Sequence, residues 1–310
     1  MALYLVTGGA GFIGSHIVEE LVARGEAVRV LDNFSTGRRG NIAPWKERIE
    51  VADADIRDLD AVRRAMTGVD YVLHQAALPS VPRSIEDPVT SNEVNVTGTV
   101  NVLWAAKEAG VKRVVYAASS SCYGNAKAEA KHEGLVPEPL SPYAVSKLAG
   151  EHYCRSFFEV YGLETVALRY FNVFGPRQDP DSPYAAVIPL FIARMKRVEA
   201  PVINGDGTQT RDFTYVKNVV AANLCACRAP RTAAGQAMNA ACGSRHSLLK
   251  LVEGLNALLG TRIPPTFGPA RAGDVMHSCA DISRARQLIG YEPQYTFEQG
   301  LEATVASMKA

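Results

Sequence analysis

The turn near the N-terminus constrains the fold of this chain more than any other segment. The apolar run at residues 3–6 leads directly into TGGAGFIGSH, and apolar residues at helical spacing follow over positions 17–22. Gly8, Gly11 and Gly14 are three residues apart, where glycine lets a backbone turn tightly, approach a pyrophosphate and pack a helix against a strand. Free N–H groups at the start of such a helix bind anions. The segment therefore predicts a strand, a turn and a helix that hold a dinucleotide.

A second predicted strand, residues 27–31, ends at Asp32. An acidic residue at this distance from the glycines receives the hydroxyl groups of the adenosine ribose. Asp32 therefore favours NAD over NADP as the cofactor. Arg38 and Arg39 follow closely and leave NADP as an alternative.

Short apolar segments alternate with helical patterns through the first half of the chain. The predicted strands lie around residues 3–6, 27–31, 49–52, 70–74, 113–118 and 165–170, and the predicted helices near 12–24, 58–66, 92–109 and 144–161. Such alternation is typical of parallel strands joined by crossover helices. We therefore predict an α/β fold with a doubly wound (Rossmann) parallel sheet, whose ligand lies beyond the carboxyl ends of the strands.

The pattern changes after about residue 172. Proline and glycine become frequent, the strands become short, and helices are predicted near 216–228, 247–259 and 297–307. We predict an NAD-binding domain over residues 1–171. Residues 172–310 should mainly form a smaller α/β lobe that binds the substrate, with some segments returning to the first domain.

Composition excludes several classes of function. The 310 residues carry 33 basic and 32 acidic side chains, without the basic tract typical of nucleic-acid binding. The sequence has neither an apolar stretch of ~20 residues nor a signal-peptide pattern, so we expect a cytoplasmic protein without a membrane span. The six cysteines lack the spacing of a zinc site, and no metal is implied.

Tyr143 and Lys147, in the segment SPYAVSK, are the candidate acid/base pair. Residues four apart meet on one helix face, and a nearby cation favours the ionised form of a phenol. The spacing also occurs by chance on solvated helices. The fifth predicted strand runs beside the cofactor and ends at Ser119. Ser119 would therefore donate to a substrate oxygen on which Tyr143 also acts.

Two other predicted strand ends carry candidate cofactor contacts. Asp55 and Ile56 follow the third strand, where Asp55 either contacts the adenine or caps the next helix. Gln75, Ala76 and Ala77 follow the fourth, where small residues would let a cofactor lie against the backbone.

Nine motifs in order resemble those of the extended short-chain dehydrogenase/reductases, and most closely those of the UDP-sugar 4-epimerases. The motifs are TGGAGFIGSH, DNFSTG, HQAA, EVNVTGT, AASSSCYG, SPYAVSK, RYFNVFGPRQDP, NGDGTQTRDFTYV and RAGDV, and they cover nearly the whole chain. The resemblance implies an NAD-dependent epimerase of the UDP-glucose or UDP-N-acetylglucosamine type. It also implies a homodimer paired through the helices near 92–109 and 144–161.

The resemblance also implies roles for individual residues. Ser119, Tyr143 and Lys147 would be catalytic. Besides the cofactor contacts above, it adds Phe12, Ile13, Asn33, Ser35, Thr36, Gly37, Asn95, Tyr143, Lys147 and Tyr170. The UDP-sugar would be held by Ser80, Ser119, Ser120, Asn172, Ala186, Val187, Ile188, Asn204, Arg211, Arg271, Asp274 and Ser278. Guanidinium groups such as those of Arg211 and Arg271 suit the two phosphates of a nucleotide sugar.

Neighbouring residues discriminate among the reactions of the family. Related dehydratases place Asp-Glu after the residue that matches Ser119, because dehydration needs a further acid and base, and related decarboxylases keep a Glu there. This chain has Ser120 and Ser121 instead, which favours oxidation at C4 followed by reduction. The alternatives are a UDP-glucuronate 4-epimerase, an NADPH-dependent reductase, and a non-catalytic NAD-sensing module.

Ser278 bears on the choice of sugar. In the epimerases this position faces the C2 substituent, and a bulky Tyr there excludes N-acetyl groups. The small Ser278 predicts that UDP-N-acetylglucosamine is accepted as well as UDP-glucose. Pro79 replaces a glycine that is usual in the N-acetyl-tolerant branch and would narrow or stiffen the pocket.

Overall fold

A seven-stranded parallel sheet forms the centre of the protein in the computed structural model, which describes residues 1–182, 185–269 and 276–308. Its strand order is β11-β6-β5-β4-β1-β2-β3. The strands are β1 (Leu3–Thr7), β2 (Ala27–Asp32), β3 (Ile49–Asp53), β4 (Tyr71–His74), β5 (Arg113–Ser119), β6 (Thr165–Tyr170) and β11 (Gln236–Ala240). All of their pairings are parallel. The predicted doubly wound fold is confirmed.

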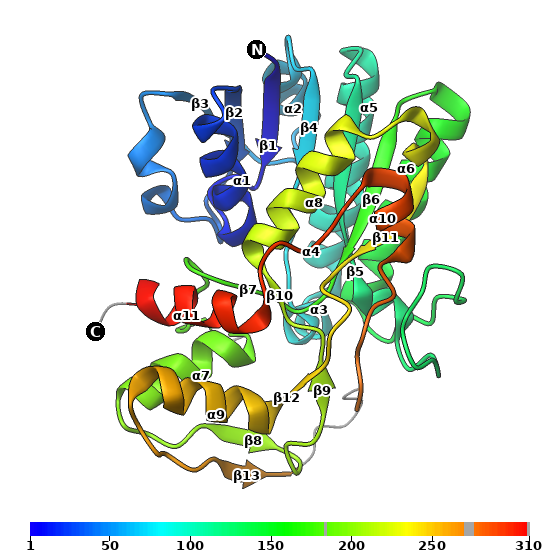
Figure 1. Ribbon diagram of the computed structural model, residues 1–310. Coiled ribbons are helices and arrows are strands. Elements are labelled where there is room, and N and C mark those ends of the chain that lie inside the picture. The colour runs from blue at the N-terminus through cyan, green and yellow to red at the C-terminus, as the bar shows by residue number, and fades with distance from the viewer. Residues whose placement is uncertain (183–184, 270–275, 309–310) are drawn as a thin grey trace.

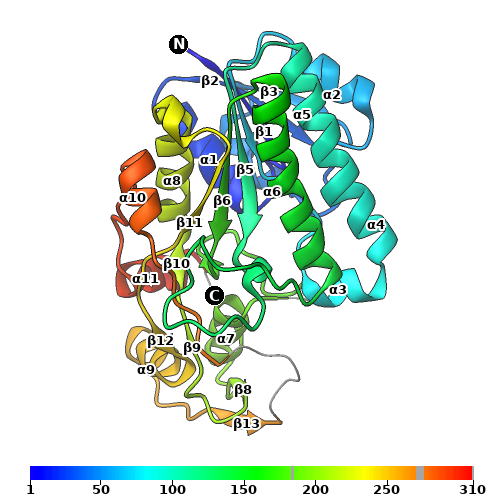
Figure 2. The same cartoon turned by 90° about the vertical axis from the view of Figure 1, so that its right-hand side faces the viewer.

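Helices cover both faces of this sheet and make a three-layer arrangement (Figure 2). One face carries α1 (Phe12–Ala23), α8 (Val216–Arg228) and α10 (Ser283–Ile289). The other carries α2 (Leu59–Met66), α5 (Gly98–Glu108) and α6 (Pro142–Tyr161). Each face encloses its own apolar core. Burial on both sides explains why β5 and β6 consist mostly of apolar residues.

A smaller lobe lies below the carboxyl ends of the strands (Figure 1). Its helices are α7 (Val187–Lys196), α9 (Leu248–Leu259) and, between the two parts, α11 (Phe297–Ser307). Three strand pairs complete it: β7 (Val173–Phe174) with β10 (Thr214–Tyr215), β8 (Val202–Asn204) with β13 (Thr266–Gly268), and β9 (Thr210–Arg211) with β12 (His246–Ser247). A third apolar core holds this lobe together.

Short helical segments connect these elements. They are α3 (Val81–Glu86), α4 (Pro88–Asn92), a π-helical segment η3 (Glu93–Thr97), and the 3₁₀ turns η1 (Arg39–Asn41), η2 (Ala43–Trp45), η4 (Ser120–Tyr123) and η5 (Arg231–Ala233). The single helix predicted near 92–109 is therefore α5 preceded by a π-helical turn. Such turns shift the register of the following helix and often occur at functional sites.

The C-terminal half of the chain contributes to the sheet as well as to the lobe. Strand β11 pairs with β6, α8 packs against α1, and α10 packs against β11. The sequence did not predict β11, because QAMNA contains only alanine and polar residues around Met238. Its pairing with the buried edge of β6 decides its conformation, since a strand depends on its partners more than on its own propensity.

Helix α6 packs very closely against β5 at one glycine. A Cβ added to Gly150 would lie 2.3 Å from the hydroxyl of Tyr116, a side chain only 1% exposed. That hydroxyl also donates to the carbonyl of Lys147 at 3.3 Å. Gly150 therefore sets how near α6 can come to the sheet.

We expect Gly150→Ala to lower the free energy of unfolding by about 1–3 kcal/mol, because the methyl group must displace a rigid, buried ring. Gly254→Ala is a matched control in the middle of α9. Its new Cβ would meet only the terminal methyl of Leu301, at 3.2 Å. Alanine favours a helix over glycine, so this control should be neutral or stabilising by up to about 1 kcal/mol. Urea unfolding measures both, and equal effects would contradict the close packing.

Candidate active site

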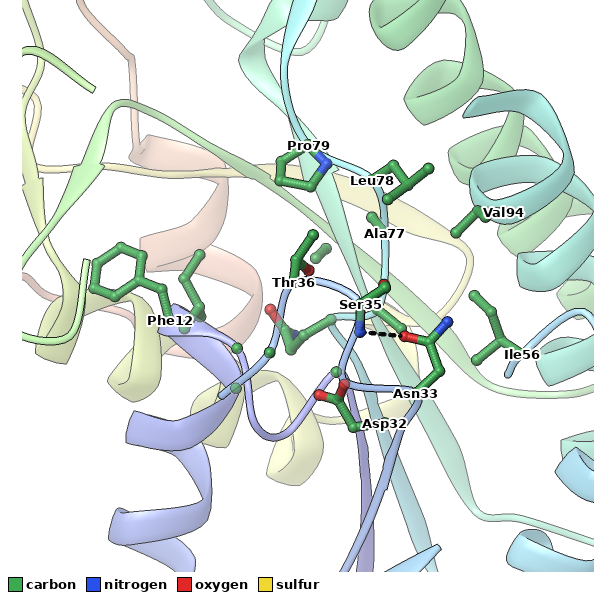
Figure 3. Close-up of a pocket in the computed structure, with 18 of the residues that line it drawn as sticks. Phe12, Asp32, Asn33, Ser35, Thr36, Ile56, Ala77, Leu78, Pro79 and Val94 are labelled. Carbon is green, nitrogen blue, oxygen red and sulfur yellow. Dashed lines mark hydrogen bonds between the residues drawn. The ribbon is translucent and has the colours of Figure 1, made fainter. Parts of the chain in front are cut away.

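One cavity of about 310 Å³ opens at the carboxyl ends of the central strands. Figure 3 shows side chains from the β1–α1 turn, the loop after β2 and the segment after β4 around it. The cavity brings together the predicted cofactor residues Gly8, Gly11, Phe12, Ile13, Gly14, Asp32, Asn33, Ser35, Thr36, Gly37, Asp55, Ile56, Gln75, Ala76, Ala77, Tyr143, Lys147 and Tyr170. Asn95 is the one predicted cofactor residue that does not line it.

The glycines at the start of α1 allow close backbone approach. Gly8 has a φ of +66°, and a Cβ on it would lie 2.7 Å from the amide nitrogen of Ala76. A Cβ on Gly14 would lie 2.1 Å from the carbonyl oxygen of Gly8. The N-cap of α1 is Gly11, which has no side chain to occupy the first N–H groups. The helix start is therefore free to bind an anion such as a pyrophosphate.

Asp32 lies at the end of β2 and is held from two sides. Its carboxylate accepts hydrogen bonds from the amides of Ala10, at 2.9 Å, and Phe34, at 2.8 Å. Burial raises the pKa of this carboxyl group, and the two amides oppose that shift. A Cβ on Gly37 would come within 2.8 Å of the carboxylate oxygens, so glycine is needed there. Asp32 is nevertheless one of the residues that line the cavity.

The two arginines that left NADP as an alternative both have carboxylate partners. Arg38 lies 2.5 Å from Asp179, and Arg39 pairs with Asp53 while its guanidinium lies 3.7 Å from the centre of the Phe34 ring. Both guanidinium groups are thus hydrogen-bonded to carboxylates other than that of Asp32. The environment of Asp32 thus accords with NAD.

Asp55 does not cap the helix after it, so that interpretation is wrong. Helix α2 is capped by Asp58, whose side chain accepts from the amides of Asp60 and Ala61. Asp55 lines the cavity, where Arg57 and the amide of Asn33, at 2.8 Å, hydrogen-bond its carboxylate. The Arg57 guanidinium is the main reason that the pKa of Asp55 falls to about 2.

Asn95 lies behind the cavity wall instead of on it. Its side chain accepts from the amide of Leu78 at 2.8 Å and donates to the Leu78 carbonyl at 3.1 Å and to the hydroxyl of Ser146 at 3.0 Å. The π-helical turn directs Asn95 inward, while its neighbour Val94 lines the cavity. Asn95 therefore joins the loop after β4 to α6.

Several wall residues were not predicted from the sequence. They are Leu31, Ala54, Leu78, Val94, Ala117 and Ala118, whereas Pro79, which was predicted at the substrate pocket, also lines this cavity. Asn223, in α8, was also missed: its amide donates to Tyr170 at 2.8 Å and accepts from Gln75 at 3.2 Å. An asparagine inside an otherwise apolar stretch of a buried helix was the only signal that could have indicated it.

The predicted catalytic pair lies in the first two turns of α6. The Ser141 side chain caps this helix by accepting from the amide of Ala144 at 3.1 Å, and Pro142 occupies its first position. Lys147 is buried, and its ammonium donates to the carbonyl of Ala117 at 3.0 Å. Burial lowers the pKa of Lys147 to about 8.

The state of the Tyr143 phenol differs from the expectation. We expected Lys147 to favour the phenolate, but burial dominates in the protein alone and raises the pKa of Tyr143. A hydrogen bond with Ser119 opposes this shift. Desolvation disfavours the charged form of any acid, so the phenolate needs additional positive charge in the cavity.

Ser119 ends β5 and caps the 3₁₀ turn η4. Its Oγ accepts from the amide of Ser121 at 3.2 Å and from the Ser121 hydroxyl at 2.9 Å. The hydrogen bond of Ser119 with Tyr143 and that of Lys147 with the Ala117 carbonyl join the end of β5 to the start of α6, so the three predicted catalytic side chains come from two elements. Ser120 is the first residue of the turn.

The predicted substrate residues are more scattered. Asn172 is exposed after β6 with a φ of 33°, and its amide donates to the carbonyl of Asp212 at 3.3 Å. Arg211 ends β9, and its guanidinium donates to the carbonyl of Thr210 at 2.9 Å. The Ser278 amide donates to the same Thr210 carbonyl at 3.0 Å, which brings Ser278 beside β9.

The remaining substrate predictions divide into three groups. Ser80 caps α3 with a φ of 108°, Ala186 caps α7, and Asn204 ends β8. Val187 and Ile188 begin α7, where Ile188 is 1% exposed and packs in the core of the lobe. Arg271 and Asp274 lie outside the described residues.

Residues 4–241 match the family model described as the NAD dependent epimerase/dehydratase family. The chain belongs to this family. The NAD prediction and the predicted extended short-chain dehydrogenase/reductase relationship are thereby confirmed. The glycine turn, the free helix start and the Asp32 carboxylate fit this cofactor.

Relatives within the family act on different sugars. The solved UDP-N-acetylglucosamine 4-epimerase from Methanobrevibacter ruminantium M1, in complex with UDP-N-acetylmuramic acid, is 40% identical and has a TM-score of 0.94, over 99% of this chain and 97% of its own. The putative UDP-glucose 4-epimerase of Methanocaldococcus jannaschii is 38% identical over 99% and 98% of the two chains. A UDP-glucuronate 4-epimerase of Thermodesulfobacterium geofontis is 33% identical over 98% and 95%.

Within residues 1–182, 185–269 and 276–308, no group of three or more His, Cys, Asp or Glu side chains could hold a metal ion. No helix in the same described ranges is long and apolar enough to cross a membrane.

Asp32→Asn should raise the dissociation constant of NAD by about tenfold. A carboxylate offers two acceptor oxygens and a carboxamide only one, so one ribose hydroxyl of bound NAD would lose its acceptor at a cost of about 1–3 kcal/mol. Asp53→Asn is the matched control. Asp53 is the residue of β3 in register with Asp32 on β2, and it does not line the cavity. Calorimetric titration of NAD into nucleotide-free protein should give a change of less than about threefold for the control. Equal losses in both variants would contradict a specific role of Asp32.

Proposed function

We propose that the protein catalyses reversible C4 epimerisation of UDP-hexoses, interconverting UDP-glucose with UDP-galactose and UDP-N-acetylglucosamine with UDP-N-acetylgalactosamine. The observation that carries this proposal is the meeting of Ser119, Tyr143 and Lys147 at the inner end of the NAD cavity. Tyr143 and Lys147 line that cavity, and Ser119 contacts Tyr143. The family relationship supports the same conclusion.

The reaction needs a group that removes and returns one proton on the sugar 4-hydroxyl. When bound, NAD supplies a hydride acceptor for C4 and later a hydride donor, so the net redox change is zero. Tyr143 takes the hydroxyl proton as a general base and returns it as a general acid. Lys147 holds positive charge beneath the site through its contact with Ala117, which favours the phenolate form of Tyr143 during the first step.

The residues after Ser119 support epimerisation over dehydration. Elimination of water needs a carboxylic acid and a carboxylate near C5 and C6 of the sugar. The corresponding residues are Ser120 and Ser121, and the Ser121 hydroxyl is already engaged with Ser119. Hydroxyl groups of this kind do not abstract a carbon-bound proton.

The second lobe would hold the nucleotide while the sugar turns. Epimerisation requires the 4-keto sugar to present its other face for hydride return, so the strong contacts should be to UDP and not to the sugar. Arg211 and Asn172 lie beside Asp212 at the start of the lobe, where they would contact the diphosphate. Ser278 is joined to the same strand through Thr210 and would face the C2 substituent.

A homodimer paired through α6 is part of the proposal. Val160 is 67% exposed and Tyr161 47% exposed on this helix, so apolar surface remains uncovered in the monomer. Helix α5 lies in the other segment predicted to pair, residues 92–109, and its Leu103 is fully buried in the core. Its apolar character therefore has a structural explanation within one chain.

The direct test incubates the protein separately with UDP-glucose, UDP-N-acetylglucosamine and UDP-glucuronate and resolves C4 epimers by proton NMR. We expect conversion of the first two. Tyr143→Phe should lower kcat by about 10²–10⁴-fold while the purified protein keeps its NAD, because only the proton transfer is lost. Failure to convert any of the three sugars would contradict the proposal, and conversion of UDP-glucuronate alone would reassign the substrate.

Ser278→Tyr should lower kcat/KM for UDP-N-acetylglucosamine at least about tenfold through steric exclusion of the acetamido group. Its kcat/KM for UDP-glucose should stay within about threefold. Ser278→Ala is the matched control and should retain both activities, because the side chain stays small. Equal losses on both sugars in Ser278→Tyr would show that this position does not discriminate at C2.

A further inference from the structure

The hydroxyl of Ser119 has more hydrogen-bond partners than a free catalytic hydroxyl needs. Its Oγ accepts from the Ser121 amide at 3.2 Å and from the Ser121 hydroxyl at 2.9 Å, and it also contacts the Tyr143 phenol. A hydroxyl group has two acceptor positions and a single hydrogen. The backbone amide can only donate, so one acceptor position is filled whatever the other groups do.

We propose that Ser121 is a positioning residue, whose amide and hydroxyl fill both acceptor positions of Ser119 Oγ and commit the Ser119 hydrogen to Tyr143. This inference rests on the proposed acid/base role of Tyr143. If Ser119 instead donated to Ser121, it would have no hydrogen left for the phenol. A phenolate can only accept, so with Tyr143 ionised all three contacts are satisfied when the Ser121 hydroxyl donates to Ser119 and the Ser119 hydroxyl donates to Tyr143.

Two consequences follow for the chemistry. Ser119 acts as a donor to the phenolate, or to the sugar oxygen that shares its position, and it cannot accept the substrate proton as a relay. The Ser121 hydroxyl also polarises the Ser119 O–H bond and strengthens its donation, since chained hydrogen bonds reinforce one another. Both effects favour the phenolate, in the same direction as the Ser119 contact that lowers the pKa of Tyr143.

Other ionisable groups on α6 and on the elements packed against it remain unchanged in a Ser121 variant. They come from α6, β5, η4, β6, α3 and η3: Lys147, Glu151, Tyr116, Cys122, Tyr123, Arg169, Arg83, Glu86 and Glu93. The pKa of Lys147 is about 8, and its titration would overlap that of an activated phenol. A measurement specific to the phenol is therefore required.

The test follows the ultraviolet absorbance of the Tyr143 phenolate against pH in the NAD-bound protein. The chain has 12 tyrosines, so each spectrum is taken as the difference from the same protein carrying Tyr143→Phe. Ser121→Ala should raise the apparent pKa of Tyr143 by about 0.5–1 unit, the size expected for one weakened hydrogen bond. Ser121→Thr retains the hydroxyl and should titrate like the unmodified protein. Ser121→Cys, with a weak donor of similar size, should shift less than Ser121→Ala.

The pH dependence of turnover gives a second readout. In Ser121→Ala the acidic limb of the plot of kcat against pH should shift to higher pH by the same amount, about 0.5–1 pH unit. The KM for the UDP-sugar and the maximal kcat should change by less than about threefold. An unshifted titration in Ser121→Ala, or an equal shift in Ser121→Thr, would overturn the proposal. A raised KM with an unshifted titration would instead make Ser121 a substrate contact. If the unmodified protein converts no UDP-sugar, the proposed function fails, and the titration still decides the role of Ser121.

Discussion

The contact between α6 and β5 is the interaction on which the rest of the site depends. Gly150 lets the helix approach until the Tyr116 hydroxyl reaches the carbonyl of Lys147, and Lys147 in turn donates to the carbonyl of Ala117. One helix turn earlier on α6, Tyr143 meets Ser119 at the end of the same strand. The distance between the backbones of α6 and β5 thus determines where the acid/base side chains lie. A change of side-chain rotamer could not bring them together if the two backbones were farther apart.

A buried ion pair fixes α6 to the neighbouring strand, β6. Arg169 on β6 binds Glu151 through two hydrogen bonds, at 2.8 and 2.6 Å, and its guanidinium lies 4.8 Å from the ring centre of Tyr123. Removing one partner of such a pair leaves an uncompensated charge in the core, so its geometry is strongly specified. Because β5 and β6 are neighbours, the helix is held against both the strand that ends at the proposed catalytic Ser119 and the strand that ends at Tyr170, which lines the cavity.

The first half of the fold could be predicted because its signals are local. The glycine turn, the strand ending at Asp32 and the capped helix SPYAVSK each carry their meaning within about ten residues. Strand β11 could not be predicted in this way, since QAMNA becomes a strand only by pairing with β6. Asn95 shows the same limit, because its neighbour Val94 lines the cavity and only the π-helical turn decides which of the two faces inward.

The sequence by itself determined the chemistry that the site contains: a dinucleotide turn, a carboxylate for a ribose, and a phenol, an ammonium and a hydroxyl in one protein. Their identities and spacings along the chain are sufficient for that. Only the tertiary structure decided their states and partners. Burial raises the pKa of Tyr143 and lowers that of Lys147, and both acceptor positions of Ser119 are filled by Ser121. Desolvation and hydrogen-bond direction depend on atoms brought together from distant segments, and no local pattern contains them.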